Sequence, residues 1–209
     1  MTKSEIAFVG DVHGDLAALN GIANLLLDDS DIEHIVFLGD YINKGRDSAK
    51  VIARLVEISA TGVVTVTVLR GNHETEMLNA IDSGDLAAFL KKGGASTIRS
   101  YVGRPVHPNV IDDFRLCVPH EHVRFLRGMR EVYETSEIIA SHLPSTTDNS
   151  RFRISAHIPV GVHPVITQNY ALLDTNCGTT TGRLTAFLWP SRRFHQVDSA
   201  GRFLESDES

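Results

Sequence analysis

The sequence predicts an α/β fold that begins with a largely parallel β-sheet and continues into a second sheet. Three apolar runs, at 6–9, 35–38 and 63–69, alternate with segments whose apolar residues recur at helical spacing. This alternation is typical of a parallel sheet with right-handed crossovers. Strand-like runs joined by turn-rich connections follow residue 130. We therefore expect a second sheet there, more antiparallel than the first.

The individual elements follow from local patterns. Each of the first three strands stops at or just before a glycine, and a helical pattern follows each of them. Asp47 or Ser48 is expected to cap the second helix. The middle of the chain, 75–130, has a helical pattern that is broken at the GGAS of 93–96. The later strands are expected at 137–141, 152–156, 170–173 and 184–189.

Composition and length indicate an ordinary globular protein. The chain has 209 residues, of which 42% are hydrophobic and 22% are charged. We expect one domain over 1–197 and a flexible acidic tail over 198–209. The formal net charge of -6 disfavours nucleic acid as a partner, because phosphate backbones favour basic surfaces.

The sequence also predicts a cytoplasmic location. Its two cysteines, Cys117 and Cys177, form no disulfide framework, which is typical of a reducing compartment. The N-terminus shows no secretory signal, and no apolar run reaches the length that spans a bilayer. We therefore expect no membrane partner, and the sequence leaves the oligomeric state open.

Metal-ligating residue types follow five of the predicted strands. In chain order they are Asp11 with His13, Asp40, Asn72 with His73, His142 and His157. In open α/β sheets, ligands bind at the carboxyl ends of the strands. The preference of Asp and Asn for tight turns could explain any one of these Asp or Asn residues, and packing in the core could explain any one of the histidines. Neither explains why all of them occur at strand ends.

These ligand types indicate a pair of divalent metal ions. Oxygen and nitrogen donors without thiolates suit Mn²⁺, Fe, Zn²⁺ or Mg²⁺. Six such groups are too many for one ordinary site, and they suit two metals about 3.5–4 Å apart that share a carboxylate. Asp40 is the natural bridge, because it is the carboxylate that stands alone after the central strand.

The motifs GDVHG, GDYINKG and GNHE resemble the signature blocks of the phosphoprotein phosphatase branch of calcineurin-like metallophosphoesterases, and KKGGASTIRSY, SAHIPV and LLDTNCGTTTGRLTAF resemble later landmarks of its bacterial serine/threonine phosphatases. The resemblance covers about 6–188. It implies a sandwich of two mixed β-sheets flanked by helices, with the metal site at the carboxyl ends of the strands.

The resemblance also implies a role for each site residue. Asp11, His13 and Asp40 would bind one metal ion, and Asp40, Asn72, His142 and His157 would bind the other. His73 would be the general acid that protonates the leaving oxygen. A hydroxide bridging the metals would attack phosphorus in line. The expected cofactors are two divalent ions, with Mn²⁺ placed first and Fe or Zn as alternatives.

Two positions depart from the family pattern. Asn43 stands where the family has an Asp that pairs with the catalytic His, and Lys44 stands where it has an Arg that binds the substrate phosphate. Asn43 is thus expected to support His73 without a charge, and Lys44 to bind phosphate without the bidentate fork of an arginine. The segment between His142 and His157 is short, and Arg151 is favoured over Arg153 as a second phosphate contact.

The leading functional hypothesis is a metal-dependent serine/threonine protein phosphatase that acts on a phosphorylated protein or a small phosphate ester. Two alternatives stay open. The first is a hydrolase of diadenosine polyphosphates or other nucleotides, which is an activity found in the same branch. The second, motivated by Asn43 and Lys44, is a weakly active pseudophosphatase that binds phosphoproteins.

Overall fold

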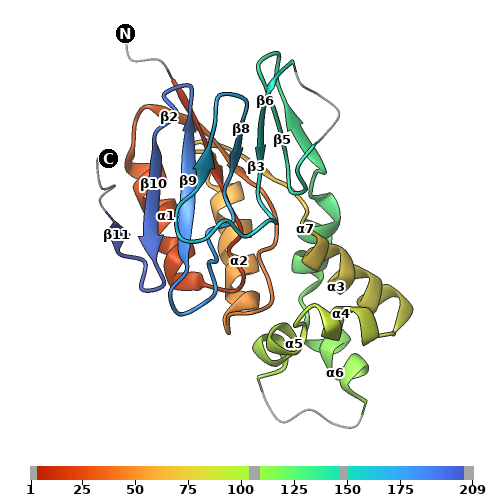
Figure 1. Ribbon diagram of the computed structural model, residues 1–209. Helices are drawn as coiled ribbons and strands as arrows, with labels where there is room; N and C mark the ends of the chain where they lie inside the picture. Colours follow the sequence, from red (N-terminus) through yellow and green to blue (C-terminus); the bar gives the residue numbers. More distant parts are fainter. Residues whose placement is uncertain (1–3, 104–108, 146–149, 205–209) are drawn as a thin grey trace.

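A computed structural model describes residues 4–103, 109–145 and 150–204, and its strands form two mixed sheets (Figure 1). The first sheet consists of β1 (Glu5–Val9), β2 (Ile32–Phe37), β3 (Thr65–Val68), β9 (Arg183–Trp189), β10 (Phe194–Asp198) and β11 (Phe203–Leu204). The second sheet consists of β4 (Val132–Glu134), β5 (Ile138–Ser141), β6 (Phe152–Ser155), β7 (Val165–Ile166) and β8 (Tyr170–Leu172).

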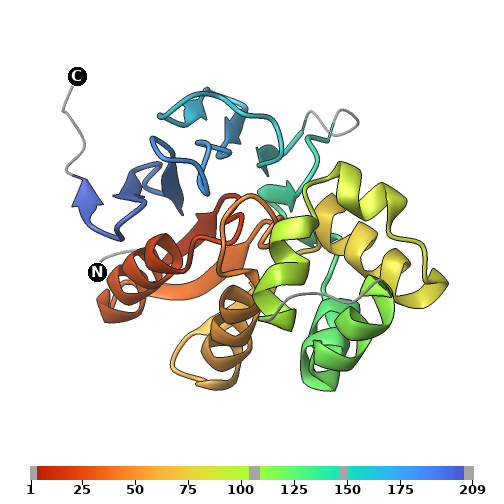
Figure 2. The same ribbon diagram turned by 90° about the horizontal axis from the view of Figure 1, so that it is seen from below.

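Helices flank these sheets. In chain order they are α1 (Leu16–Asp28), α2 (Ser48–Ala60), α3 (Asn72–Ser83), α4 (Ala87–Lys91), α5 (Ala95–Val102), α6 (Val110–Cys117) and α7 (His120–Gly128). Figure 2 shows α1 and α2 along one side of the first sheet, with the strands of the second sheet on its other side. The predicted α/β architecture of two mixed sheets flanked by helices is confirmed.

The strand pairings confirm the parallel start of the first sheet and correct two other expectations. Strands β1, β2 and β3 pair in parallel, as the alternation of strand and helix predicted. The run at 184–189, expected in the second sheet, is β9, which pairs antiparallel with β1. It is buried along nearly its whole length, because its side chains pack against other elements on both faces of the first sheet. The second sheet is also not the more antiparallel one, since β6 pairs in parallel with both β5 and β8.

Alternation of side chains along the central strands builds two cores. Ala7 and Val9 of β1 face the helices, together with Ile35 and Phe37 of β2. Phe8 points the other way and joins a core that also contains side chains of β2, β5, β6, β8 and β9. The second core holds the two sheets together, so the carboxyl ends of β1, β2, β3, β5 and β6 are fixed relative to one another.

The C-terminal region differs from the predicted tail. Residues 198–204 form the end of β10, a turn and β11, and Asp198 accepts hydrogen bonds from the main chain of Ala200 and Arg202. The tail boundary expected at residue 198 is therefore wrong, and 205–209 lie outside the described residues. Within the described ranges, no helix has the length and apolar character needed to cross a bilayer.

Candidate metal centre

The loops after β5 and β6 and the start of α3 deliver three donor atoms to one point. His142 Nε2 lies 3.2 Å from Asn72 Oδ1, 3.1 Å from His157 Nδ1 and 3.3 Å from Asp40 Oδ1. Donor atoms that share one ion at about 2.1 Å lie about 3.0–3.4 Å apart. One ring nitrogen cannot donate a proton to three neighbours, so these distances fit a shared cation better than a hydrogen-bond network.

A second group of donors adjoins the first across Asp40. His13 Nε2 lies 3.4 Å from Asp11 Oδ2 and 4.0 Å from Asp40 Oδ2, and His73 Nε2 lies 3.6 Å from the same Asp40 oxygen. Among the described residues, two triads have ligand atoms that all lie within 4.8 Å of one another, His13–Asp40–His73 and Asp40–His142–His157. Asp40 belongs to both, which is the arrangement expected of a bridging carboxylate.

Main-chain carbonyl groups orient two of the imidazole rings toward the cluster. The Nδ1 atom of His142 lies 3.1 Å from the carbonyl oxygen of Leu38, and Nδ1 of His13 lies 3.1 Å from that of Ile42. If each Nδ1–H donates to its carbonyl, each Nε2 presents its lone pair to the centre. Metal-binding histidines are commonly fixed in this way.

Buried charge provides a further test of whether these residues fit a cation. Asp11 Oδ2 is buried and has no hydrogen-bond partner among the described residues. Burial, together with the charges of Asp40 and Asp174, raises the pKa of Asp11 to about 6 despite the nearby His13. Burial opposes ionisation of His142 too, but Asp40 raises the pKa of that ring to about 9. Without a metal ion, a protonated histidine therefore balances the buried carboxylates, and divalent cations suit the same place.

Backbone strain also gathers at this centre. Only seven non-glycine residues in the described part of the chain have positive φ, and five of them are His13 (47°), Asp40 (54°), Asn43 (72°), Lys44 (52°) and His157 (66°). Left-handed conformations are costly for residues with a Cβ and persist where the surroundings enforce them. Such strain is characteristic of functional sites, and here it falls on the residues that the motifs singled out.

Glu74 supports the conformation of Asp40, a role more specific than the structural one that its position in GNHE suggests. Its carboxylate is completely buried and accepts hydrogen bonds from the main-chain N–H groups of Asp40, Tyr41 and Gly71 at 2.9, 2.9 and 3.0 Å. It therefore ties the end of β2 to the start of α3. The main-chain N–H of His73 also donates to Asp40 Oδ1, at 3.1 Å.

Substituting Gly71 by alanine is expected to weaken Mn²⁺ binding by about ten- to a hundredfold. A Cβ atom at this position would overlap Asp40 Oδ1 and lie 2.7 Å from Glu74 Oε2, so the bridging carboxylate would have to move. Isothermal titration calorimetry with Mn²⁺ measures the change. Gly128→Ala is the matched control, since no atom of the described ranges lies within 4 Å of its added Cβ. Equal Mn²⁺ affinity in both variants would contradict the placement of Asp40.

Asn43 contacts His73 through its side-chain amide. Its Nδ2 lies 2.5 Å from His73 Nδ1 and donates to the Lys92 carbonyl oxygen at 3.0 Å, while Oδ1 accepts from the Thr97 hydroxyl at 2.7 Å. With the amide held in this way, the neutral His73 ring accepts at Nδ1 and carries its proton on Nε2, the nitrogen that faces Asp40. Burial is the main reason that the pKa of His73 falls to about 4, and the charges of His13, Lys44 and Lys92 contribute.

Sequence reasoning missed the contacts that Thr97 and Lys92 make with Asn43. Lys92 and Thr97 directly flank the GGAS segment at 93–96. The glycine pair of that segment was the one sequence feature that could have indicated a close approach to Asn43. The charge of Lys44, which follows Asn43 in the sequence, contributes to the lowered pKa of His73. Its expected contact with phosphate stays a prediction.

The structure does not bring Arg151 to this centre, and the expectation that it contacts phosphate is wrong. Arg151 precedes β6, and His157 follows it, so the two residues lie at opposite ends of the strand. The Arg151 guanidinium forms an ion pair with Glu134 of β4 at 3.0 Å. The alternation of side chains along β6 places Arg151 on the same face as His157. It does not place the two residues at the same end of the strand, and only the end that carries His157 meets the metal ligands.

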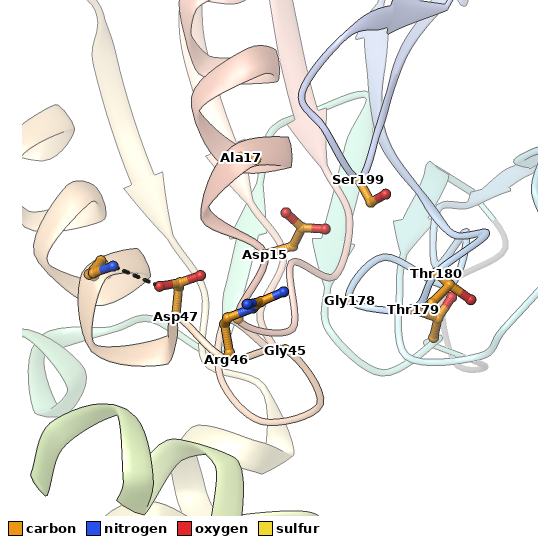
Figure 3. A pocket seen from close by; sticks show the side chains of 11 residues that line it. Asp15, Ala17, Gly45, Arg46, Asp47, Gly178, Thr179, Thr180 and Ser199 are labelled. Carbon is orange, nitrogen blue, oxygen red and sulfur yellow. Dashed lines mark hydrogen bonds and ion pairs between the residues drawn. The ribbon is translucent and has the colours of Figure 1, made fainter. Parts of the chain in front are cut away.

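A pocket of about 580 Å³ opens beside the His13 loop, where α1 and α2 begin (Figure 3). Gly14, Gly45 and Gly178 are among its lining residues, and a Cβ at Gly178 would lie 2.5 Å from the carbonyl oxygen of His13. Figure 3 shows Asp15, Arg46 and Asp47 on one side of the pocket and Thr179 and Thr180 on the other. Because its carboxylates and cations are balanced in number, the pocket has no marked preference for an anion.

Comparison with known proteins places these features in a family context. A model of the calcineurin-like phosphoesterase family matches residues 4–170. Serine/threonine-protein phosphatase SIT4 of Candida albicans is 30% identical over 146 residues, which are 65% of this chain and 46% of that protein. The chain spans less than half the length of the curated relatives that it matches.

Solved structures share the fold at low sequence identity. A candidate diadenosine tetraphosphatase superposes with a TM-score of 0.66 at 16% identity, covering 93% of each chain. The cold-active protein-tyrosine phosphatase of a psychrophilic Shewanella superposes with a TM-score of 0.64 at 15% identity, covering 97% of this chain and 80% of that one. At such identities the likeness concerns the fold alone.

Proposed function

The chain belongs to the calcineurin-like phosphoesterase family, and from this premise we propose that it hydrolyses phosphate monoesters, with phosphoserine or phosphothreonine in a protein as the preferred substrate. The observation that carries the proposal is the convergence of donors on Asp40, which both triads share. The similarity to a serine/threonine phosphatase supports the choice of substrate.

The proposed ligands divide into two sets. Asp11, His13 and Asp40 hold one divalent ion, and Asp40, Asn72, His142 and His157 hold the other. The ions, when bound, acidify water and neutralise charge on the phosphoryl oxygens. The donor chemistry fits Mn²⁺ and fits Fe or Zn²⁺ as well.

The remaining roles concern protons and the phosphate. His73 delivers a proton from Nε2 of its cationic form to the leaving oxygen, which leaves the neutral ring. The low pKa of His73 and the uncharged Asn43 beside Nδ1 keep the population of that cationic form small. Lys44 binds a phosphate oxygen with a single cationic group. The loops after β5 and β6 of the second sheet supply His142 and His157.

Mn²⁺-dependent hydrolysis of 4-nitrophenyl phosphate is the first test of this function. Side-by-side turnover of a phosphoserine peptide and of diadenosine tetraphosphate then separates the two enzymatic hypotheses, and the peptide should be the better substrate. Turnover no faster than that of a His73→Ala variant would favour the pseudophosphatase. The retained donor set argues against that alternative, because phosphopeptide binding alone does not require six metal ligands.

The variant that combines Asn43→Asp with Lys44→Arg is expected to raise kcat/KM on an aryl phosphate by about tenfold. A carboxylate at position 43 would accept from a protonated His73 Nδ1 and stabilise the cationic ring, and an arginine would bind phosphate with two donors. Steady-state kinetics measures the change, with Lys44→Arg alone as the control for the phosphate contact. An unchanged kcat/KM would show that these two positions do not limit the reaction.

A further inference from the structure

A groove of about 220 Å³ lies on the second β-sheet, beside the loops that carry two of the proposed metal ligands. We call it the β6–β8 groove, and the residues that line it include Pro144, Arg153, Ser155, Ile158, Tyr170 and Leu172. Pro144 stands two positions after His142, and Ile158 directly follows His157. One end of the groove therefore adjoins the metal centre.

The β6–β8 groove opens on the outer face of the second sheet. Ile154 of β6 and Ala171 of β8 point into the core that joins the two sheets. Arg153 and Tyr170 precede them and pair with each other in register, so they lie on the opposite face. Figure 2 shows this sheet on the side of the molecule away from α1 and α2. Ile158, at the end near the centre, keeps 45% of its surface exposed.

Arg153 carries the one charge among the described residues that line this groove. Its guanidinium carbon lies 5.8 Å from the centre of the Tyr170 ring, and Nη1 donates to the carbonyl oxygen of Ser145 at 3.4 Å. Nε is buried and has no hydrogen-bond partner in the described ranges. Arg151, in contrast, is paired with Glu134. Arg153 therefore offers an unpaired cationic edge next to an apolar surface.

The volume and chemistry of the groove limit what it can hold. An apolar cavity of roughly 150 Å³ accommodates a ring the size of benzene, whereas pockets for drug-sized ligands reach about 300–1,000 Å³. The groove is thus suited to one branched or aromatic side chain and is smaller than a nucleoside requires. A guanidinium without a carboxylate partner favours an acidic group beside that side chain. A polypeptide can provide both groups.

We propose that the β6–β8 groove binds the polypeptide of a phosphoprotein substrate, with an apolar side chain of the substrate in the groove and a carboxylate of the substrate on Arg153. This inference rests on the proposed function. Arg153 precedes His157 by four residues, which span about 13 Å in an extended chain. In an extended substrate, residues two and four positions from the phosphoserine lie on one face and match this spacing. The first would be apolar and the second acidic.

The test uses the full chain loaded with Mn²⁺ and two phosphoserine peptides of equal length. One peptide has leucine two positions and glutamate four positions from the phosphoserine, and the other has alanine and glutamine there. Each is made with these residues before and after the phosphoserine, so that both chain directions are tested. In one direction, the leucine–glutamate peptide should have a kcat/KM at least about tenfold higher, through a lower KM.

Substitutions of Arg153 test the charged contact. Arg153→Met should raise KM for the leucine–glutamate peptide by about tenfold, and Arg153→Glu should shift the preference to a peptide with lysine in place of glutamate. Arg151→Met is the matched control, since Arg151 lies outside the groove, and it should change this KM by less than about twofold. Turnover of 4-nitrophenyl phosphate, which has no flanking residues, should stay within about twofold in all three variants.

The apolar contact has a variant of its own. Leu172→Ala widens the groove without touching Arg153, and it should reduce the advantage of leucine over alanine in the peptide by about threefold or more. The advantage of glutamate over glutamine should remain. Loss of neither preference in Leu172→Ala and Arg153→Met would overturn the proposal.

The outcomes distinguish this proposal from the proposed function. If 4-nitrophenyl phosphate is hydrolysed but the two peptides are turned over equally, the role of the groove is overturned and the function stands. If no phosphate ester is hydrolysed, the function fails, and fluorescence anisotropy with labelled peptides still tests the groove. Tighter binding of the leucine–glutamate peptide that Arg153→Met abolishes would then support it. A dimer in sedimentation that Arg153→Met dissociates would overturn it, because a second copy would occupy the groove.

Discussion

Replacing Asp40 with asparagine is expected to lower kcat/KM for phosphate esters by at least about a thousandfold, and to reduce the bound Mn²⁺ from two ions per chain to one or none. Asp40 is the residue that both donor triads share, with one oxygen 3.3 Å from His142 Nε2 and the other 3.6 Å from His73 Nε2. An amide keeps the shape of the side chain but offers one weaker oxygen donor in place of two charged ones.

Metal analysis and kinetics should be carried out on the same preparation of the Asp40→Asn variant. Asp113→Asn is the matched control, because it neutralises a buried carboxylate of α6 that lies outside the centre. The control should retain two Mn²⁺ ions and its activity. An Asp40→Asn variant that still binds two ions and turns over substrate at the original rate would exclude Asp40 as the bridge.

The His73→Gln substitution is expected to reduce kcat on an alkyl phosphate by about 10²–10³-fold, and to reduce it much less on 4-nitrophenyl phosphate. An alkoxide leaving group needs a proton, whereas nitrophenolate leaves without one. The ratio of the two rates therefore reports on proton donation, which a general loss of structure would not change selectively. Mn²⁺ stoichiometry should remain two ions per chain.

This experiment also decides between two roles for His73. Its Nε2 lies close enough to Asp40 for His73 to belong to a triad with His13, so a ligand role is geometrically open. Loss of one Mn²⁺ ion, with equal rate losses on both substrates, would identify His73 as a ligand and not as the acid. His120→Gln changes an exposed histidine at the start of α7 and serves as the control.

Strand ends were the part of the centre that sequence reasoning could predict. Asp11, Asp40 and Asn72 each follow an apolar run and a glycine, and parallel strands bring such positions to one edge. The position of these ligands could be predicted from the local sequence, because each ligand lies within a few residues of the strand that positions it. The same reasoning reached His142 and His157, which follow β5 and β6.

Contacts made between distant segments were not predictable in this way. Lys92 meets Asn43 because the turn between α4 and α5 folds over the loop after β2, and no periodicity reports that approach. The prediction that Arg151 lies at the site was wrong for a related reason. Arg151 and His157 lie at opposite ends of β6, and the pattern of the strand does not show which end faces the site. Similarly, β9 has an ordinary strand pattern, and only its pairing with β1 assigns it to the first sheet.

A crystal of the protein soaked in Mn²⁺ and measured at the manganese absorption edge tests the central claim most directly. We predict two anomalous peaks, one on each side of the Asp40 carboxylate, with Asp11 and His13 at one and Asn72, His142 and His157 at the other. A map with no peak next to Asp40, or with ions bound only by other residues, would contradict the claim that these side chains form a metal centre.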